Sequence, residues 1–176
     1  MAAICLVGMP GVGKSRIGQS LAKHYGWTFI DTDKVMAAST SESVSDMLNR
    51  LGRDQFIERE NAALLQLSPA VDQVISPGGS AIYCREGLSH VASFATIVYL
   101  ADSVDRILKR VTNMDSRGIV WTFPGQRFDQ LFKERDSLYR QIADIIYPLP
   151  QGFPFSTTSD DIAGDLAQWL SRRIAR

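Results

Sequence analysis

The stretch that decides the fold is Gly8-Met9-Pro10-Gly11-Val12-Gly13-Lys14-Ser15, which matches the phosphate-binding pattern G-x-x-x-x-G-K-[ST]. Glycines in this pattern let backbone N–H groups turn inward around phosphate oxygens, and the following helix points its N-terminus at the anion. The lysine reaches the terminal phosphates, and the serine hydroxyl binds Mg²⁺. We therefore expect ATP and magnesium to bind at Gly11, Val12, Gly13, Lys14 and Ser15.

The residues on either side of this loop agree with it. Met1–Val7 is a short apolar run typical of a buried strand, and Lys14–Tyr25 has helical spacing and stops before Gly26. The dinucleotide fingerprint G-x-G-x-x-G is absent, which disfavours a Rossmann oxidoreductase. The N-K-x-D motif with which GTPases read their base is absent too. The loop therefore favours a compact ATP-dependent kinase.

The rest of the chain alternates short apolar runs with helical patterns, which is typical of a parallel sheet covered on both faces. Further strands are expected at Trp27–Ile30, Gln73–Ser76, Thr96–Leu100 and Phe153–Phe155. Further helices are expected at Ser43–Leu51, Asp54–Leu67, Val104–Val111, Arg127–Ile146 and Ile162–Ile174. The sequence thus predicts a three-layer α/β/α P-loop fold with about five parallel strands. Residues 1–176 are expected to form one kinase domain, with a mobile lid at about residues 112–125.

Composition narrows the choice of partners. The 176 residues carry 19 Lys plus Arg and 19 Asp plus Glu, so the net charge is zero, whereas binding to nucleic acid or to an acidic membrane needs a basic surface. The first apolar run lacks a basic leader and is too short to span a bilayer. We expect a cytoplasmic protein with a small-molecule substrate, and nothing in the sequence suggests more than a monomer.

Two carboxylates follow the second expected strand, in the segment Asp31-Thr32-Asp33. Ligands of open α/β sheets bind at the carboxyl ends of the strands. Residues two apart in a strand share a face, so both side chains are expected to point toward the phosphate loop. One would then hold magnesium, and the other would orient an attacking hydroxyl or accept its proton. The alternative is that an aspartate here caps a helix that starts near Lys34.

Taken together, these motifs resemble the shikimate kinase family, small enzymes of the nucleoside-monophosphate-kinase type. The resemblance covers nearly the whole chain, and its parts occur in the family's order and spacing. Beyond the P-loop and the two aspartates they are the Gly52…Phe56…Glu60 helix, Ser76-Pro77-Gly78-Gly79-Ser80-Ala81, the lid segment around Arg117, and Glu134-Arg135…Leu138-Tyr139. The glycine turn and the E-R-x-x-L-Y segment are the more specific parts.

The resemblance implies a role for each matching residue. Asp31 would support magnesium with Ser15, and Asp33 would bind substrate hydroxyls and act as base or orienter beside the catalytic Lys14. Gly78 and Gly79 would offer backbone N–H groups to the substrate. Arg135 would grip the substrate carboxylate. Arg117 on the lid would close over ATP and stabilise charge on the phosphoryl group in transit.

The acceptor side departs from the family pattern at three positions. The family's arginine after Phe56, which forks onto the shikimate carboxylate, is Ile57 here. Arg53 lies one helical turn back and could partly replace it, whereas Arg59 is expected to point away. The third glycine of the substrate turn is Ser80, and Gly118 stands where family members often have proline.

These departures leave three hypotheses. The first is phosphorylation of shikimate to shikimate 3-phosphate. The second is a kinase of the same fold that acts on a different polyol or sugar acid, as the changes at positions 57 and 80 suggest. The third is a non-catalytic ATP-binding module, although such a module would not need the two aspartates.

Overall fold

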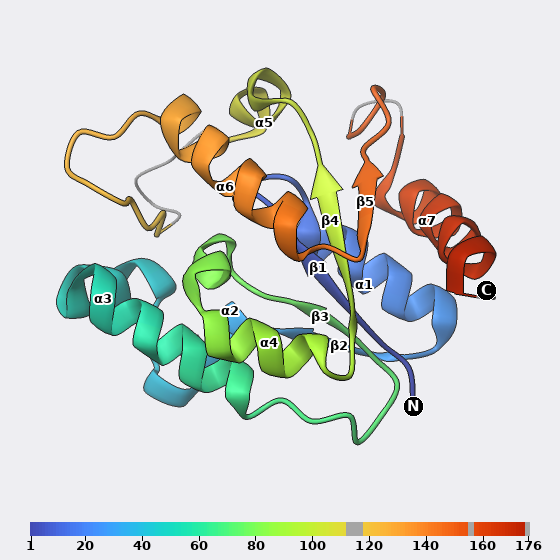
Figure 1. Ribbon diagram of the computed structural model, residues 1–176, viewed down its shortest axis with the longest axis horizontal. Helices are drawn as coiled ribbons and strands as arrows, with labels where there is room; N and C mark the ends of the chain where they lie inside the picture. The colour runs from blue at the N-terminus through green and yellow to red at the C-terminus, as the bar shows by residue number, and fades with distance from the viewer. Residues whose placement is uncertain (112–117, 155–156, 175–176) are drawn as a thin grey trace.

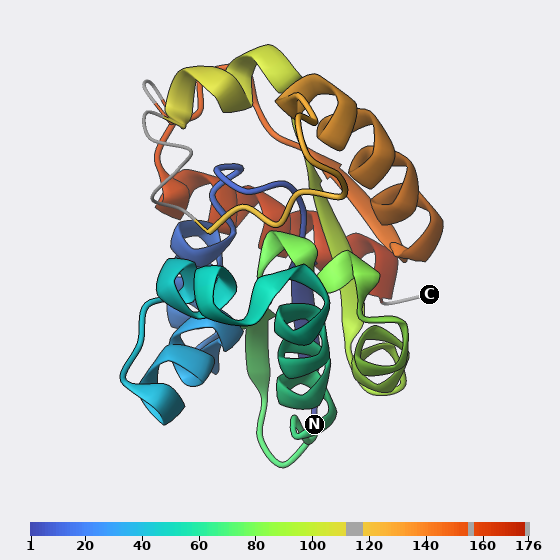
Figure 2. The ribbon, with the colours of Figure 1, turned by 90° about the vertical axis from the view of Figure 1, so that its left-hand side faces the viewer.

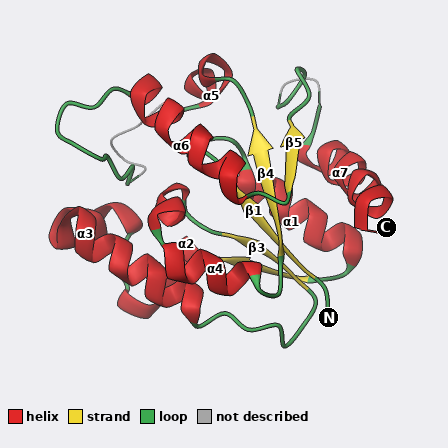
Figure 3. Cartoon of the chain, viewed as in Figure 1, coloured by secondary structure: helices red, strands yellow, loops and turns green. Residues whose placement is uncertain are grey.

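Five parallel strands form the sheet at the centre of the molecule (Figures 1 and 3). The computed structural model of the protein describes residues 1–111, 118–154 and 157–174. The strands are Ala3–Val7 (β1), Thr28–Asp31 (β2), Gln73–Ser76 (β3), Thr96–Ala101 (β4) and Ile145–Pro148 (β5), in the order β2-β3-β1-β4-β5. All residues of β1 and β3 are buried, because a parallel sheet is covered on both faces. The predicted five-stranded parallel sheet is confirmed.

Helices cover both faces of this sheet, as Figure 2 shows from the side. Lys14–Tyr25 (α1) packs against Ser159–Ile174 (α7) on one face. The other face carries Thr32–Thr40 (α2), Val44–Leu65 (α3), Arg85–Ala92 (α4), Val104–Arg110 (α5) and Phe128–Ile142 (α6). This split follows from right-handed crossovers, since β1 leads to β2 in one direction along the sheet and β3 leads to β4 and β5 in the other. No described helix is both long enough and apolar enough to cross a bilayer.

The last strand lies elsewhere than predicted. The expected helix to Ile146 stops at Ile142, and Ile145–Pro148 form β5 beside β4. The Asp144 carboxylate starts the pairing, because it accepts a hydrogen bond from Ile97 N at 2.8 Å. The predicted strand at Phe153–Phe155 is therefore wrong: Phe153 and Pro154 lie in a turn, and residue 155 is outside the described part.

The helices that follow β2 and β3 also differ in detail from the prediction. Two helices separated by Gly52 were expected, and α3 does change direction there, because Gly52 has φ 75° and ψ 173°. Helix α2 begins directly after Asp31, so Asp33 belongs to a helix and not to the strand. The 3-10 helix Gly79–Tyr83 (η1) was not expected from the sequence, and α4 lies outside the predicted helix ranges.

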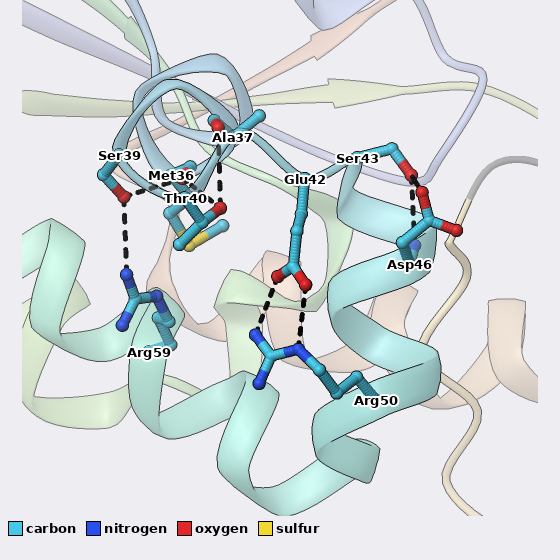
Figure 4. Close-up of polar contacts among 9 residues, drawn as sticks. All are labelled: Met36, Ala37, Ser39, Thr40, Glu42, Ser43, Asp46, Arg50 and Arg59. Atoms are coloured by element: carbon cyan, nitrogen blue, oxygen red, sulfur yellow. Dashed lines mark hydrogen bonds and ion pairs between the residues drawn. The ribbon is translucent and has the colours of Figure 1, made fainter.

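A small second core sits beside the main one, at the end of the molecule where α2 and α3 meet. Its buried members are Met36, Met47, Phe56 and Val120. Polar contacts around the α2–α3 connection close this end (Figure 4): Arg50 forms a two-pronged ion pair with Glu42, at 2.9 and 2.7 Å. The ion pair links the loop that precedes α3 to the first half of this helix.

Candidate functional site

A cavity of about 580 Å³ lies where the loops after β1, β2 and β3 converge. Segments of α5, α6 and residues 118–120 complete its wall. The residues predicted from sequence that line it are Gly11, Gly13, Lys14, Ser15, Asp31, Asp33, Gly78, Gly79 and Arg135. Val12 does not line it, since its side chain is fully buried in the main core. The structure therefore brings the expected nucleotide side and the expected acceptor side into one space.

The phosphate loop leads into α1 through Gly13, whose φ of 107° favours glycine. No side chain caps this helix end, so the amide groups of its first turn face the cavity as an anion site. The Lys14 ammonium lies across the loop and donates to the carbonyl oxygens of Gly8 at 2.8 Å and of Met9 at 3.2 Å. Burial lowers the pKa of Lys14 to about 8, while Asp33 and Asp31 oppose that shift. A bound phosphate would favour the charged ammonium further.

Ser15 and Asp31 supply adjacent oxygen atoms, because the Ser15 hydroxyl donates to Asp31 Oδ2 at 2.9 Å. The other carboxylate oxygen of Asp31 accepts from Lys34 N at 3.3 Å and so caps α2. The metal interpretation and the capping interpretation of this residue are thus compatible. The described residues contain no cluster of three or more His, Cys, Asp or Glu that could hold a metal. A hydroxyl and one carboxylate fit Mg²⁺, which keeps several waters and binds phosphate oxygens.

Asp33 stands in the first turn of α2 and lines the cavity. Burial raises its pKa to about 6, and the nearby Lys14 ammonium limits that shift. The carboxyl is thus largely ionised at neutral pH while its basicity exceeds that of an exposed aspartate. Such a group can accept a proton from a substrate hydroxyl.

The turn after β3 brings its backbone very close to these carboxylates. A Cβ atom on Gly78 would lie 2.4 Å from Glu60 Oε1 and 2.7 Å from Asp33 Oδ1. A Cβ atom on Gly79 would lie 2.7 Å from the Pro10 ring. Both glycines are therefore required by close approach, and bare backbone faces the acceptor end of the cavity.

Arg135 lies beneath that turn with none of its surface exposed. It donates through Nη2 to the Val120 carbonyl and through Nε to the Tyr83 hydroxyl at 3.3 Å. Its Nη1 atom is buried without a hydrogen-bond partner, although the residue lines the cavity. A buried unpaired donor is costly, so an anionic ligand at this end of the cavity would satisfy it.

Sequence reasoning assigned no role to Glu60, although its motif was noticed. This side chain on α3 is 1% exposed and accepts a hydrogen bond from the Ser80 hydroxyl at 2.6 Å. Its Oε1 atom is buried without a partner. Burial raises the pKa of Glu60 from its ordinary 4.5 to about 8. The pairing joins positions 20 residues apart, so nothing local in the sequence could reveal it.

This raised pKa predicts a pH-dependent stability. The native chain holds a proton on Glu60 that the unfolded chain releases, so the stability is full below pH 4.5 and falls as pH rises toward 8. We expect Glu60→Gln to raise the free energy of unfolding by on the order of 3 kcal/mol at pH 8.5, and to change it little at pH 4.5. Urea unfolding over this pH range measures both values.

The control for this prediction is Glu58→Gln, an exposed position on the same helix. It should leave the pH dependence of stability as in the unmodified protein. If the free energy of unfolding of Glu60→Gln and of the unmodified protein changed with pH in the same way, the pKa of Glu60 would not be raised and the prediction would be wrong.

Neither neighbouring arginine replaces the side chain lost at position 57. Ile57 packs against both apolar cores and does not line the cavity. Arg53 forms an ion pair with Asp54 at 2.6 Å, lies over the Tyr83 ring, and is absent from the cavity lining. Arg59 reaches Ser39 on α2 at 3.4 Å, on the outside of the helix pair (Figure 4). The expectation that Arg59 points away is confirmed, and Arg53 does not take over the lost contact.

Two further features concern the nucleotide side. Arg117, expected on the lid, lies outside the described residues. Arg110, which sequence reasoning missed, lines the cavity, pairs with Asp102 and donates to the Val12 carbonyl at 3.1 Å. Its guanidinium lies 5.3 Å from the centre of the Phe153 ring. The only sequence signal for it is a basic residue at the end of a predicted helix, which many surface helices share.

The chain is similar to known proteins in sequence. A sequence model of the shikimate kinase family matches residues 10–151. A shikimate kinase of Chromobacterium violaceum is 35% identical over 147 residues, which are 83% of this chain and 80% of that protein. One from Thiobacillus denitrificans is 32% identical and covers 80% of this chain and 77% of its own length.

Solved structures extend this likeness to three dimensions. The shikimate kinase of Acinetobacter baumannii, solved in complex with shikimate, superposes with a TM-score of 0.85 at 28% identity, covering 98% of this chain and 95% of that one. The Aquifex aeolicus enzyme, with a TM-score of 0.76 at 23% identity, shares the fold and covers 96% of each chain. Because the family model matches most of the chain and these relatives are more than 30% identical to it, this chain belongs to the shikimate kinase family.

Proposed function

We propose that this protein transfers the γ-phosphoryl group of ATP to a ring hydroxyl of shikimate and forms shikimate 3-phosphate. The observation that carries the proposal is that Lys14, Asp33 and Arg135 line a single cavity. The relative from Acinetobacter baumannii was solved with shikimate bound. A phosphate-binding end and a carboxylate-binding end in one space suit a hydroxy acid as acceptor.

Each residue then has a definite task. Asp33 orients the hydroxyl and takes its proton as the oxygen bonds to the γ-phosphorus, while the bond between that phosphorus and the bridging oxygen breaks and ADP leaves. Lys14 and the amides of the phosphate loop stabilise the transferred charge. Arg135 offers its unpaired Nη1 to the acceptor carboxylate. Gly78 and Gly79 present backbone to the acceptor.

Magnesium and the lid belong to the same proposal. Ser15 and Asp31 would hold Mg²⁺, which when bound neutralises phosphate charge. Arg117 would stabilise the phosphoryl group from the lid. Arg110 and Pro154 would flank the nucleotide, since both line the cavity beside the phosphate loop. We propose that the protein works in the cytoplasm as a monomer of one domain.

The test is a coupled ADP-release assay with ATP, Mg²⁺ and shikimate, titrated to high millimolar shikimate. We expect saturable turnover well above ATP hydrolysis without acceptor, with a raised KM because Ile57 supplies no charged contact. Loss of one charge-assisted hydrogen bond corresponds to a KM about tenfold to several hundredfold higher than with an arginine there. Turnover no higher than the background hydrolysis would contradict shikimate as the acceptor.

A second candidate is a different polyol or sugar acid, which the altered wall at Ile57 and Ser80 favours. The same assay with a panel of such acceptors distinguishes the two. A sugar acid with a kcat/KM above that of shikimate would replace the first proposal. ATP binding without transfer to any of these compounds would instead indicate a binding module.

A further inference from the structure

The acceptor end of the cavity has few polar side chains with which to bind a carboxylate. Arg135 contributes one free nitrogen, because its other donors are used by Val120 and Tyr83. Ile57 and Arg53 do not line the cavity. Ser80, which follows the glycine turn, is a further polar residue of the cavity lining. Among the described residues, Ser80 is therefore a candidate for the contact that the arginine at position 57 would have made.

Ser80 is held in a defined position. It stands in the first turn of η1, directly after Gly79, and is 6% exposed. Its hydroxyl lies 2.6 Å from Glu60 Oε2. A hydroxyl has one proton to donate and two lone pairs with which to accept. Whether Ser80 can donate a hydrogen bond to a ligand therefore depends on whether Ser80 or Glu60 is the donor in the hydrogen bond between them.

The surroundings of Glu60 favour the protonated carboxyl. The side chain is buried, and among the described residues its hydrogen-bond partner is the neutral hydroxyl of Ser80. The titratable and charged groups that face it are Asp33 of α2, Lys14 of α1, Arg135 and Tyr139 of α6, and Cys84 after η1. Burial is the dominant influence and raises the pKa of Glu60 to about 8, although the Ser80 hydrogen bond, Arg135 and Lys14 each act to lower it.

The proton on Glu60 sets the direction of the hydrogen bond. An ionised Glu60 can only accept a hydrogen bond, and the single hydroxyl proton of Ser80 then points toward it. A protonated Glu60 can donate to Ser80 Oγ, and the Ser80 proton is then free to point into the cavity. An incoming carboxylate would favour this second arrangement, because it adds negative charge near Glu60 and accepts from Ser80.

We propose that Ser80 is a specificity-determining residue of the acceptor site, whose hydroxyl, backed by the buried Glu60 carboxyl, donates to the acceptor carboxylate in place of the arginine lost at position 57. Glu60 acts through Ser80 and is a positioning residue. The family pattern has an arginine and a glutamate at these two positions, whose charges cancel. Ile57 and a protonated Glu60 are both neutral, so the net charge of this wall of the cavity is the same. The inference rests on the proposed use of shikimate as acceptor.

Ser80→Ala tests the donor directly. We expect the KM for shikimate to rise about tenfold at pH 7, as for loss of one hydrogen bond to a charged group, while kcat changes less than about twofold. Steady-state kinetics at saturating ATP measure both constants. The matched control is Ser171→Ala, whose exposed hydroxyl bonds only to its own helix, at Gln168 O, and which should leave KM unchanged.

Glu60→Gln tests the positioning role by keeping a permanent donor to Ser80. The KM of the unmodified enzyme should rise about fivefold to tenfold from pH 7 to pH 9 as Glu60 loses its proton. The KM of Glu60→Gln should change less than about twofold over this range. Lys14 and Asp33 titrate in both proteins, so the difference between them reports Glu60. Glu58→Gln should behave as the unmodified enzyme.

The double variant separates hydrogen bonding from simple charge repulsion. If Glu60 acts through Ser80, Ser80→Ala alone flattens the pH dependence of KM, and adding Glu60→Gln changes nothing further. If Ser80→Ala retains the full rise of KM with pH, or binds shikimate as tightly as the unmodified enzyme, the inference is overturned while shikimate remains the acceptor. An unmodified enzyme that does not phosphorylate shikimate overturns the proposed function and the inference together.

Discussion

Replacing Asp33 by asparagine should lower the kcat of shikimate phosphorylation by about three orders of magnitude, the range expected for loss of a general base. Asparagine keeps the size of the side chain and its place in the first turn of α2, but it cannot take a proton. Stopped-time assays of phosphorylated product at saturating substrates measure the change. ATP affinity, measured by calorimetry, should stay within about twofold.

The control for this prediction is Asp54→Asn, an exposed carboxylate on α3 that pairs with Arg53 at 2.6 Å. It should leave kcat unaltered. If Asp33→Asn kept more than about a tenth of the normal kcat, Asp33 would be neither base nor orienter, and the proton would have to leave by another route.

Arg135→Lys should raise the KM for shikimate by about a hundredfold. Lysine keeps the positive charge but has no planar fork, so it cannot bond Val120, Tyr83 and an acceptor carboxylate at once. Part of the effect is structural, because the segment at residues 118–120 loses its anchor on α6. We therefore expect a drop of about 2 kcal/mol in the free energy of unfolding as well.

Steady-state kinetics and urea unfolding measure the two effects of Arg135→Lys separately. Arg140→Lys on the same helix is the matched control, since Arg140 is exposed and pairs with Asp136 at 2.8 Å. A KM close to that of the unmodified enzyme, with lowered stability alone, would assign Arg135 to the fold and remove it from the acceptor site.

Sequence reasoning succeeded where a local pattern has a single physical meaning. The P-loop requires a strand before it and a helix after it, and both lie where predicted. Gly52 forced a break in a helical pattern, and its positive φ shows why. The paired aspartates reach the cavity as expected, although Asp33 does so from a helix.

Where the sequence misled, distant contacts decide the structure. The run Ile145-Ile146-Tyr147 suits a helix or a strand equally well, and the hydrogen bond of Asp144 to Ile97 selects the strand. The acceptor wall could not be foreseen for the same reason. The sequence shows that the arginine is missing at position 57, but only the fold reveals that Ser80 contacts Glu60 and that Arg53 does not line the cavity.

Both carboxylate oxygens of Asp31 form hydrogen bonds, which limits the substitutions that the site can accept. One oxygen of its carboxylate meets Ser15, and the other holds the end of the helix that carries Asp33. Under the proposed roles, a change at Asp31 therefore disturbs both the magnesium site and the position of the proton acceptor. In a double-mutant cycle the penalties at Asp31 and Asp33 should fall short of additivity. Under the proposed roles, metal binding and hydroxyl activation are therefore energetically coupled.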